Sequence, residues 1–366
     1  MQESVPQGAM EMNILILNKR YAPALGGVER YLSEVARVLV DQGHKVQVIC
    51  SKHNRRLQTY EQLDGVDVFR YPYVQGLFLF PIIVSIIVHV ARWWWRKRIR
   101  TPDLIVARNA HLADILDRYY DCRKIYVVPA VFSELDSLRK ESYPFLLRIF
   151  YSLARISLDQ SERRVMSRYS NIVFSDLMKR KLEKMGISSV VIRPGVDTER
   201  FSAGNRHDGC VVLAVGRLAR AKQYDLLIRA FTRIKDQRVR CWILGEGIER
   251  SRLERIISQN GLIDVVTLLG ARNDIESYYA RADIFVITSS SESFGHVGLE
   301  AMASGIPIIS MDNKNIGFNE LLSEGQNGML VRDEQELADA IQKLCQNPDL
   351  RERIGSKNSR EAKDFT

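Results

Sequence analysis

Short apolar runs alternate with segments of helical periodicity along the whole chain. Asn13–Leu17 (NILIL) is an apolar run of strand length, and a periodic helical segment closed by Gly43 follows it. The run HKVQVIC at 44–50 is the next predicted strand. Strand, helix and strand in this order are the repeating unit of a parallel sheet, so we predict a βαβ opening.

The same alternation restarts in the second half. Strand, loop and helix patterns recur at 210–231, 240–257 and 265–287. A chain of 366 residues is too long for one ordinary core. The sequence therefore predicts an α/β protein with two Rossmann-like domains, which we place at residues 1–192 and 193–366.

The most informative stretch is Ser289–Ser310 (SSSESFGHVGLEAMASGIPIIS). It follows an apolar strand and predicts a loop, a short helix, a stop at Ser304 and Gly305, and a second strand. A loop rich in serine and glycine that enters a helix presents backbone N–H groups and the positive end of the helix dipole. This pattern predicts a phosphate site.

Two carboxylates, Glu292 and Glu300, lie in this stretch. Carboxylates beside a phosphate are oddly placed unless they serve an uncharged group, and hydroxyl groups donate well to them. Phosphate together with several hydroxyls indicates a sugar nucleotide. The alternative is that each glutamate only compensates the helix dipole.

A glycine pair, Gly26 and Gly27, precedes the first predicted helix. Glycines allow backbone amides to approach a phosphate closely, although a plain turn is the alternative. The loop has neither the spacing of the dinucleotide fingerprint nor that of the Walker P-loop. The sequence therefore argues against a dehydrogenase.

Composition limits which partners and which cellular compartment we expect. The net charge of +9 favours phosphate-bearing partners, and without an RNA- or DNA-binding motif we expect no nucleic acid. Five scattered cysteines predict neither a disulfide framework nor a zinc site, so a reducing cytosol fits best. The N-terminal MQESVPQGAMEM lacks the pattern of a secretory signal and is interpreted as a short disordered lead.

Two segments of the first half combine apolar and basic residues. The apolar run Leu77–Val90 is too short to span a bilayer, and Trp93–Trp95 and a basic group at 96–100 follow it directly. Arg139–Arg164 has the spacing of a basic amphipathic helix. Core packing is the alternative for each, but together they favour peripheral binding to an anionic membrane surface, on the cytoplasmic, inner face of the plasma membrane.

Several motifs resemble those of one enzyme family. SESFGHVGLEAMASGIP resembles the two-glutamate motif of retaining GT-B glycosyltransferases of the GT4-like (glycosyltransferase group 1) family. GRLARAK, GEGIER and ARNDIESYYARADIFV resemble that family in order, and GGVER resembles its N-terminal loop. The resemblance implies two Rossmann-like domains that face a cleft. Because family chains continue past a segment like EAKDFT, the second domain is interpreted as shortened at its C-terminus.

The resemblance also implies roles for individual residues. Arg217 and Lys222 would hold the donor pyrophosphate, where two cations and backbone amides can stabilise the leaving charge without a metal. Glu300 would bind the ribose hydroxyls, and Glu292 the hydroxyls of the donor sugar. The remaining candidates are donor-binding Gly26, Gly27, Gly245, Glu246, Arg272, Phe294, Gly295, His296 and Val297, together with His111, which would reach the reacting sugar.

The expected enzyme is a retaining hexosyltransferase without a metal or other cofactor. It would move a hexosyl or N-acetylhexosaminyl group from a UDP- or GDP-sugar to a lipid-linked or cell-envelope glycan. Two alternatives stay open at this point. One is a GT-B nucleotide-sugar epimerase, and the other is a non-catalytic pseudo-glycosyltransferase.

Overall fold

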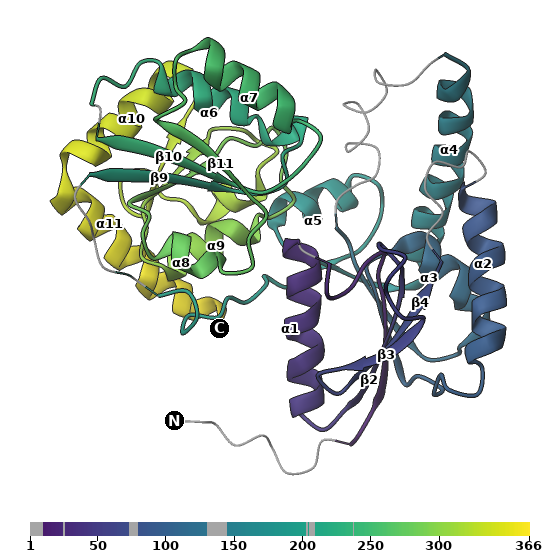
Figure 1. The fold of residues 1–366 in the computed structure, drawn as a ribbon. Helices are drawn as coiled ribbons and strands as arrows, with labels where there is room; N and C mark the ends of the chain where they lie inside the picture. Colours follow the sequence, from purple (N-terminus) through teal and green to yellow (C-terminus); the bar gives the residue numbers. More distant parts are fainter. Residues whose placement is uncertain are drawn as a thin grey trace. The chain divides into compact units, whose positions relative to one another are not determined.

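The computed structural model describes residues 10–24, 26–72, 80–129, 145–202, 204, 209–236 and 238–366, with side chains described outside 80–83 and 145–155. The chain divides into two compact units (Figure 1). The first unit comprises Met1–Val173 and Lys181–Val190, and the second comprises Phe174–Arg180 and Val191–Thr366. The predicted N-terminal lead lies largely outside the described residues.

The first unit contains an eight-stranded sheet in the order β3-β4-β2-β1-β5-β6-β7-β8. Strand β3 pairs antiparallel with β4, and the pairs from β4 to β7 are parallel. The strands are β1 (Asn13–Leu17), β2 (Lys45–Ser51), β3 (Tyr60–Leu63), β4 (Val66–Tyr71), β5 (Leu104–Ala107), β6 (Arg123–Val127), β7 (Ser170–Val173) and β8 (Val190–Val191). The predicted βαβ opening is therefore confirmed by β1 and β2 and the helix between them.

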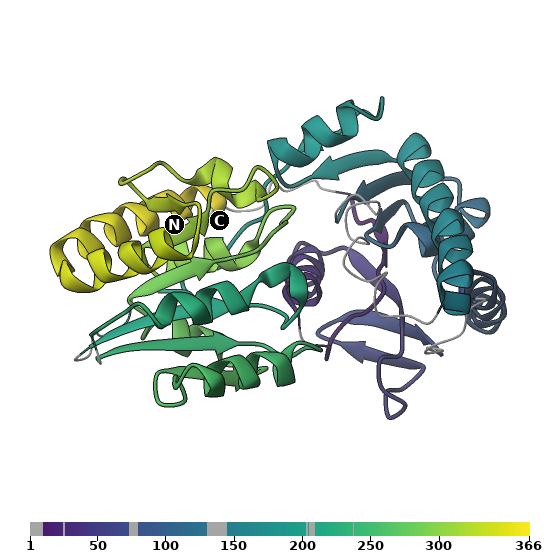
Figure 2. The ribbon, with the colours of Figure 1, turned by 90° about the horizontal axis from the view of Figure 1, so that it is seen from above.

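Helices cover both faces of this sheet, which is why its central strands β1 and β5 are nearly continuous apolar runs. Figures 1 and 2 show α1 on one face and α2, α3 and α4 on the other, with α2 and α4 side by side. The helices are α1 (Gly27–Asp41), α2 (Phe80–Trp95), α3 (Ala110–Leu116) and α4 (Phe145–Arg168), followed by α5 (Asp176–Glu183) after β7. No helix among the described residues is both long enough and apolar enough to cross a membrane.

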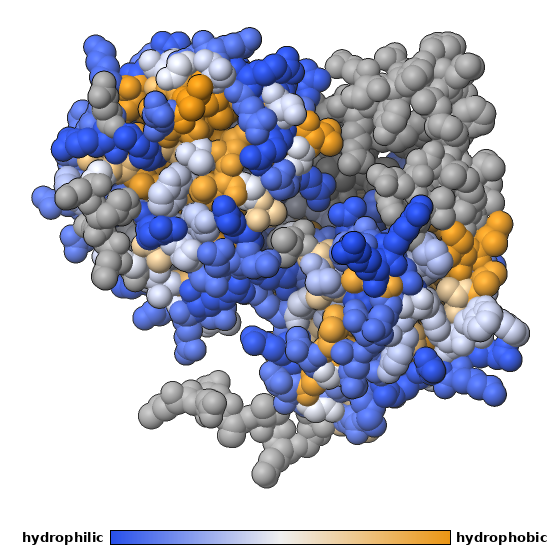
Figure 3. Space-filling model, in the orientation of Figure 1, coloured by the Kyte–Doolittle hydropathy of each residue, from blue (hydrophilic) through white to orange (hydrophobic). Residues whose placement is uncertain are grey.

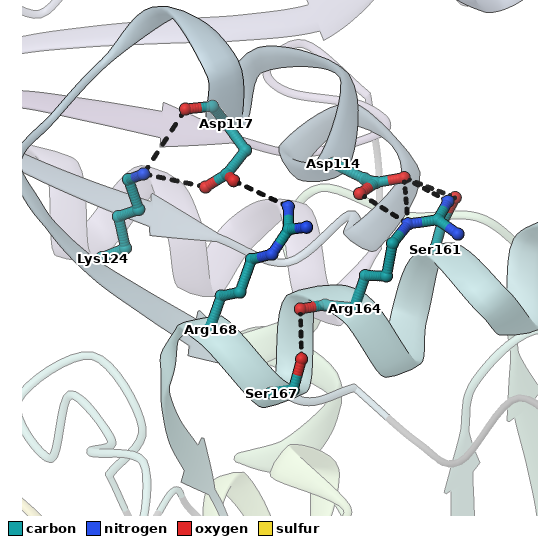
Figure 4. A network of polar contacts seen from close by, with 7 residues as sticks. All are labelled: Asp114, Asp117, Lys124, Ser161, Arg164, Ser167 and Arg168. Atoms are coloured by element: carbon teal, nitrogen blue, oxygen red, sulfur yellow. Dashed lines mark hydrogen bonds and ion pairs between the residues drawn. The ribbon is translucent and has the colours of Figure 1, made fainter.

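A polar network joins the C-terminal half of α4 to α3 and β6 (Figure 4). The Arg164 guanidinium donates to the Asp114 carboxylate at 2.6 Å, and Arg168 donates to Asp117 at 3.0 Å. Lys124 completes the network with an ion pair to Asp117 at 2.8 Å. Partial burial raises the pKa of Asp114, but the hydrogen bonds from Arg164 and Ser161, together with the charges of Arg164 and Arg168, outweigh it and leave this pKa below its ordinary value. The network therefore fixes the direction of α4 on this face of the sheet.

The second unit contains a six-stranded parallel sheet in the order β11-β10-β9-β12-β13-β14. Its strands are β9 (Cys210–Val215), β10 (Val239–Leu244), β11 (Val266–Gly270), β12 (Ile284–Ile287), β13 (Ile308–Met311) and β14 (Gly328–Val331). This is the doubly wound order, and its direction reverses between β9 and β12. Ligands of such sheets bind outside the carboxyl ends of the strands at this switch point.

Helices also cover both faces of the second sheet. Figure 1 shows α6 and α7 on one face and α8 and α9 on the other, while α10 contacts α6 and α11 contacts α9. The helices are α6 (Tyr224–Phe231), α7 (Arg250–Gln259), α8 (Ile275–Tyr279), α9 (His296–Ala303), α10 (Glu334–Gln346) and α11 (Pro348–Glu361). Side chains of Asp333 and Asn347 accept from the first turns of α10 and α11, as expected for N-caps.

The units differ from the predicted domains at residues 191–192 and in one short segment. Phe174–Arg180 belongs to the second unit although the chain returns to the first unit after it. Two contacts account for this: the Ser175 hydroxyl donates to the Ser293 carbonyl at 2.6 Å, and the Asp176 N–H donates to the Glu320 carboxylate at 2.8 Å. Sequence spacing could not show a contact between residues more than a hundred positions apart.

The prediction of no disulfide is wrong for one pair of cysteines. Cys210, the first residue of β9, is joined to Cys345, near the end of α10, with their Cα atoms 5.7 Å apart. The two residues are 135 positions apart in the chain, and the last turn of α10 lies at the amino end of β9. Scattered spacing therefore gave no signal, because the fold brings the pair together. Cys50, Cys122 and Cys241 are free thiols.

Candidate functional site

Two loops meet at the switch point of the second sheet. One follows β9 at residues 216–222, and the other follows β12 at residues 288–295. The Ser290 N–H donates to the Ala221 carbonyl at 2.8 Å, and the Thr288 hydroxyl donates to the Lys222 carbonyl at 2.7 Å. These bonds hold the two loops together where the fold predicts a ligand.

An ion pair between Lys222 and Glu292 joins the side chains of the two loops. Each side chain is 22% exposed, so the pair is half-buried but open to a ligand. The backbone of Glu292 is also fixed, because its N–H donates to the Asn315 carbonyl and its carbonyl accepts from the Gly317 N–H, both at 2.8 Å. A phosphate could draw Lys222 from this pair, and the carboxylate would then be available to a hydroxyl.

Tyr224 lies under the same pair. It is 4% exposed, and burial raises the pKa of its phenol, with a further increase from the Glu292 carboxylate. The phenol therefore stays neutral at physiological pH. A side chain at Gly216 would meet the Tyr224 hydroxyl, so glycine is required there by close packing. Sequence reasoning did not select Tyr224 or Gly216.

Gly245 also serves packing. It has a φ of +144°, and a Cβ atom there would clash with the Gly216 carbonyl oxygen. The lack of a side chain at Gly245 allows the end of β10 to pack closely against the backbone of the loop after β9. The next residue, Glu246, continues this contact, because its carbonyl accepts from the Leu218 N–H at 3.0 Å. The carboxylate of Glu246 instead pairs with Arg250 at 2.7 Å.

The N-terminus of α9 opens at the same switch point. Gly295 precedes the helix with a φ of +99°, and His296 is its first residue. The Phe294 side chain is 1% exposed and packs edge-on against Phe174 and Phe318, so it belongs to the core. The His296 ring packs in the same way against Phe174. The groups that could bind a phosphate are therefore the backbone amides of this turn, including that of Val297, rather than its aromatic rings.

Glu300 is oriented by a residue that sequence reasoning missed. It is 8% exposed, and the Tyr279 hydroxyl donates to its carboxylate at 2.8 Å. Tyr279 ends α8, and its ring stacks on Phe285 of β12. The ring is thus held on the core while its hydroxyl fixes one carboxylate oxygen. The sequence signal that could have identified it is a tyrosine at the end of the helix that precedes β12.

The two arginine candidates of this unit have exposed side chains. Arg217 is exposed in the loop after β9, and Arg272 is exposed after β11, where its Nε donates to the Leu269 carbonyl at 3.1 Å. Glu320 caps α5, because its carboxylate accepts from the Asp176 N–H and from Arg180 at 2.9 Å. Within the described ranges, no group of three or more His, Cys, Asp or Glu residues is placed to hold a metal ion.

Gly26, Gly27 and His111 lie in the first unit. The glycines follow β1, with Gly27 as the first residue of α1. His111 follows β5 as the second residue of α3 rather than in a loop, and its Nδ1 lies 3.5 Å from the Ser161 hydroxyl. Strands β1 and β5 are parallel neighbours, so the segments that carry these residues leave the first sheet at the same ends of its strands.

Family models match both halves of the chain. The model described as Glycosyltransferase Family 4 matches residues 25–200, and the model described as Glycosyl transferases group 1 matches residues 195–361. A lipopolysaccharide core biosynthesis glycosyltransferase, LpsE of Rhizobium meliloti, is 25% identical over 91% of this chain and 89% of its own length.

Solved structures show the same fold over nearly the whole chain. Sucrose-phosphate synthase from Thermosynechococcus elongatus has a TM-score of 0.82 at 19% identity, covering 97% of this chain and 95% of that one. HepE from Anabaena, solved in complex with UDP-glucose, has a TM-score of 0.74 at 21% identity with the same coverage. The predicted architecture of two Rossmann-like domains, the GT-B fold, is confirmed.

Proposed function

Because the chain belongs to the GT4-like group 1 glycosyltransferases, we propose that it transfers a hexosyl or N-acetylhexosaminyl group from a UDP- or GDP-sugar to a lipid-linked or cell-envelope glycan. The observation that carries this proposal is the Lys222–Glu292 pair at the switch point of the second sheet. Here a cation for phosphate and a carboxylate for hydroxyls lie side by side. A sugar attached to a diphosphate presents both a phosphate and hydroxyls.

The site residues divide the donor between them. Lys222, the exposed Arg217 and the amides at the start of α9 would hold the diphosphate. Glu300, with one oxygen bound by Tyr279, would accept hydrogen bonds from the ribose hydroxyls. Glu292 would accept hydrogen bonds from the sugar hydroxyls once phosphate engages Lys222. This division is consistent with the UDP-glucose bound by HepE.

The chemistry follows from the charge that develops on the leaving group. Cleavage of the sugar–phosphate bond places negative charge on the nucleotide diphosphate, and fixed cations and amides stabilise it as it forms. We propose that this stabilisation needs no metal ion. Transfer would retain the anomeric configuration, with the acceptor attacking on the face that the diphosphate leaves and the diphosphate taking the acceptor proton.

The acceptor is proposed from the relatives and from the first unit. LpsE is described as a lipopolysaccharide core biosynthesis glycosyltransferase, and for this chain we propose a glycan carried on lipid as the acceptor. Such an acceptor would place this protein at the inner face of the plasma membrane. We propose that Gly26 and Gly27 of the first unit serve the donor phosphate and that His111 reaches the reacting sugar.

The test is a panel of UDP- and GDP-sugars incubated with envelope lipid extract, with and without EDTA. We expect one donor to give both nucleotide release and a sugar-modified lipid, unchanged by EDTA and greatly reduced in Glu292→Ala. Release of nucleotide without an acceptor-linked sugar would instead favour epimerase or hydrolase chemistry. Equal turnover by Glu292→Ala would remove this residue from the site.

A further inference from the structure

Helix α2 has apolar side chains on two opposite faces. One face is buried and consists of Val84, Val88, Ala91 and Trp95, which are at most 9% exposed. These residues follow helical spacing and face the rest of the first unit, where α2 contacts α3, α4 and β4. This face is the apolar packing surface of the described part of the helix.

The opposite face is apolar and exposed. Ile86 is 56% exposed, Val90 53%, Trp93 59% and Trp94 72%. At 100° per residue these positions fall on one side of the helix, away from the buried stripe. We call these four residues the exposed α2 face. Figure 3 shows hydrophobic surface over α2, at the right of the view. A contiguous exposed apolar strip of this kind marks an interaction surface.

Basic residues continue the exposed α2 face at its C-terminal end. Arg96, Lys97, Arg98 and Arg100 follow Trp95, and the sequence has no Asp or Glu between Phe80 and Arg100. Arg100 is neutralised by Asp67 at 3.0 Å, whereas Arg96 lies over the Trp93 ring, 4.6 Å from its centroid. Among the described residues, Arg96 and Lys97 have no carboxylate partner. The end of the strip therefore carries positive charge.

The helix is held firmly enough to present this face. The Arg92 guanidinium lies 3.6 Å from the centroid of the Tyr119 ring, and the Tyr119 hydroxyl lies 2.7 Å from His89 Nδ1. The neighbouring α4 is fixed by the Arg164–Asp114 pair of Figure 4, and its Ile156 is 53% exposed. The exposed face thus belongs to a rigid layer of helices.

We propose that the exposed α2 face and the adjoining Arg96 and Lys97 bind the surface of an anionic lipid bilayer. Tryptophans beside basic residues suit the boundary between acyl chains and headgroups, and the cations attract anionic headgroups. The helix has 16 residues, about 24 Å, so it lies along the surface rather than across the bilayer. This inference deepens the proposed function, because a lipid-linked acceptor is presented at the same surface.

The test is co-sedimentation of the full chain with phosphatidylglycerol–phosphatidylcholine vesicles and with pure phosphatidylcholine vesicles. We expect binding to the anionic vesicles that weakens with salt. We expect Arg96→Glu with Lys97→Glu to reduce the partition coefficient by about thirtyfold or more, since each basic residue near such a surface contributes about 1 kcal/mol. Trp93→Ser with Trp94→Ser should reduce it at least tenfold.

Matched controls lie on the second unit. Ile248 and Ile263 are 90% and 66% exposed, so Ile248→Ser with Ile263→Ser removes exposed apolar surface elsewhere. Lys235→Glu with Arg255→Glu makes the same change of charge at two exposed positions. Both controls should bind vesicles within twofold of the unchanged protein. Thermal unfolding followed by circular dichroism checks that every variant is folded.

Three outcomes would overturn the proposal. They are equal binding by the tryptophan variant, equal binding to neutral vesicles, and a homodimer in light scattering that the tryptophan variant abolishes while vesicle binding is absent. Calorimetric titration with UDP and GDP separates this inference from the proposed function. Vesicle binding without nucleotide binding would contradict only the proposed transferase function. Nucleotide binding without vesicle binding would contradict only the proposal that the exposed α2 face binds membranes.

Discussion

The two units carry loops at the same kind of sheet edge but hold them differently. In the second unit, the loops after β9 and β12 are joined by Ser290 to Ala221, by Thr288 to Lys222, and by the Lys222–Glu292 pair. In the first unit, the loops after β1 and β5 meet through backbone bonds from Arg108 and Asn109 to the Leu17 carbonyl. The second unit holds a charged side-chain pair between its loops, whereas the first has glycines in its loop after β1 and carries the exposed α2 face.

This difference suggests a division of work. A diphosphate and its hydroxyls need a few charged groups at fixed positions, because stabilisation of developing charge depends on preorganisation. An acceptor held at a membrane needs orientation of a whole surface instead. Four experiments test this comparison, in order of the size of the expected effect.

Lys222→Ala should have the largest effect. It removes the cation of the central pair and leaves the Glu292 carboxylate facing the diphosphate, so kcat/KM should fall by about a hundredfold to a thousandfold. Steady-state transfer with the identified donor measures this. Lys235→Ala, at an exposed position away from the loops, is the control and should keep full activity. A loss below fivefold in Lys222→Ala would place the diphosphate elsewhere.

Gly245→Ala and Gly27→Ala should change the free energy of unfolding by different amounts. A Cβ at Gly245 clashes with the Gly216 carbonyl and has an unfavourable φ, so the free energy of unfolding should fall by about 2–4 kcal/mol. A Cβ at Gly27 meets nothing within 4 Å, so stability should be unchanged or slightly higher. Urea denaturation measures both. Equal losses of stability in the two variants would show that both glycines are required by close packing.

Removal of the Cys210–Cys345 disulfide should destabilise only the second unit. Cys210→Ser opens a loop closed over 135 positions, and the free energy of unfolding under oxidising conditions should fall by about 2–4 kcal/mol. Unfolding with and without dithiothreitol measures this, and Cys241→Ser, at a buried free thiol, is the matched control. If dithiothreitol leaves the unchanged protein equally stable, the disulfide contributes nothing to stability.

Tyr279→Phe should have the smallest effect. It removes one hydrogen bond to the buried Glu300 carboxylate, so donor binding should weaken by about fivefold to tenfold, with the fold unchanged. The change should appear in KM for the donor more than in kcat. Tyr278→Phe, on the same helix, is the control and should leave KM unaltered. A fall in kcat alone would show that Tyr279 acts on the reaction rather than on the ribose site.

The architecture was predictable because parallel strands are apolar runs of a few residues with periodic helices between them. The loops around Glu292 and Lys222 were predictable because their residue types match phosphate and hydroxyl chemistry. Tyr279 was missed because it contributes one hydroxyl from a ring that otherwise belongs to the core, and Tyr224 because its ring is buried like a core residue. The Cys210–Cys345 disulfide was missed because only the folded sheet brings its ends together.

Calorimetric titration of donor and product tests the central claim most directly. UDP or GDP and the matching sugar nucleotide are titrated into the unchanged protein, Lys222→Ala and Glu292→Gln. We expect Lys222→Ala to weaken both ligands. Glu292→Gln should weaken only the sugar nucleotide and bind the free diphosphate as tightly as before or more tightly, because Lys222 loses its competing partner. Equal weakening of both ligands in Glu292→Gln would contradict the assignment of Glu292 to the sugar.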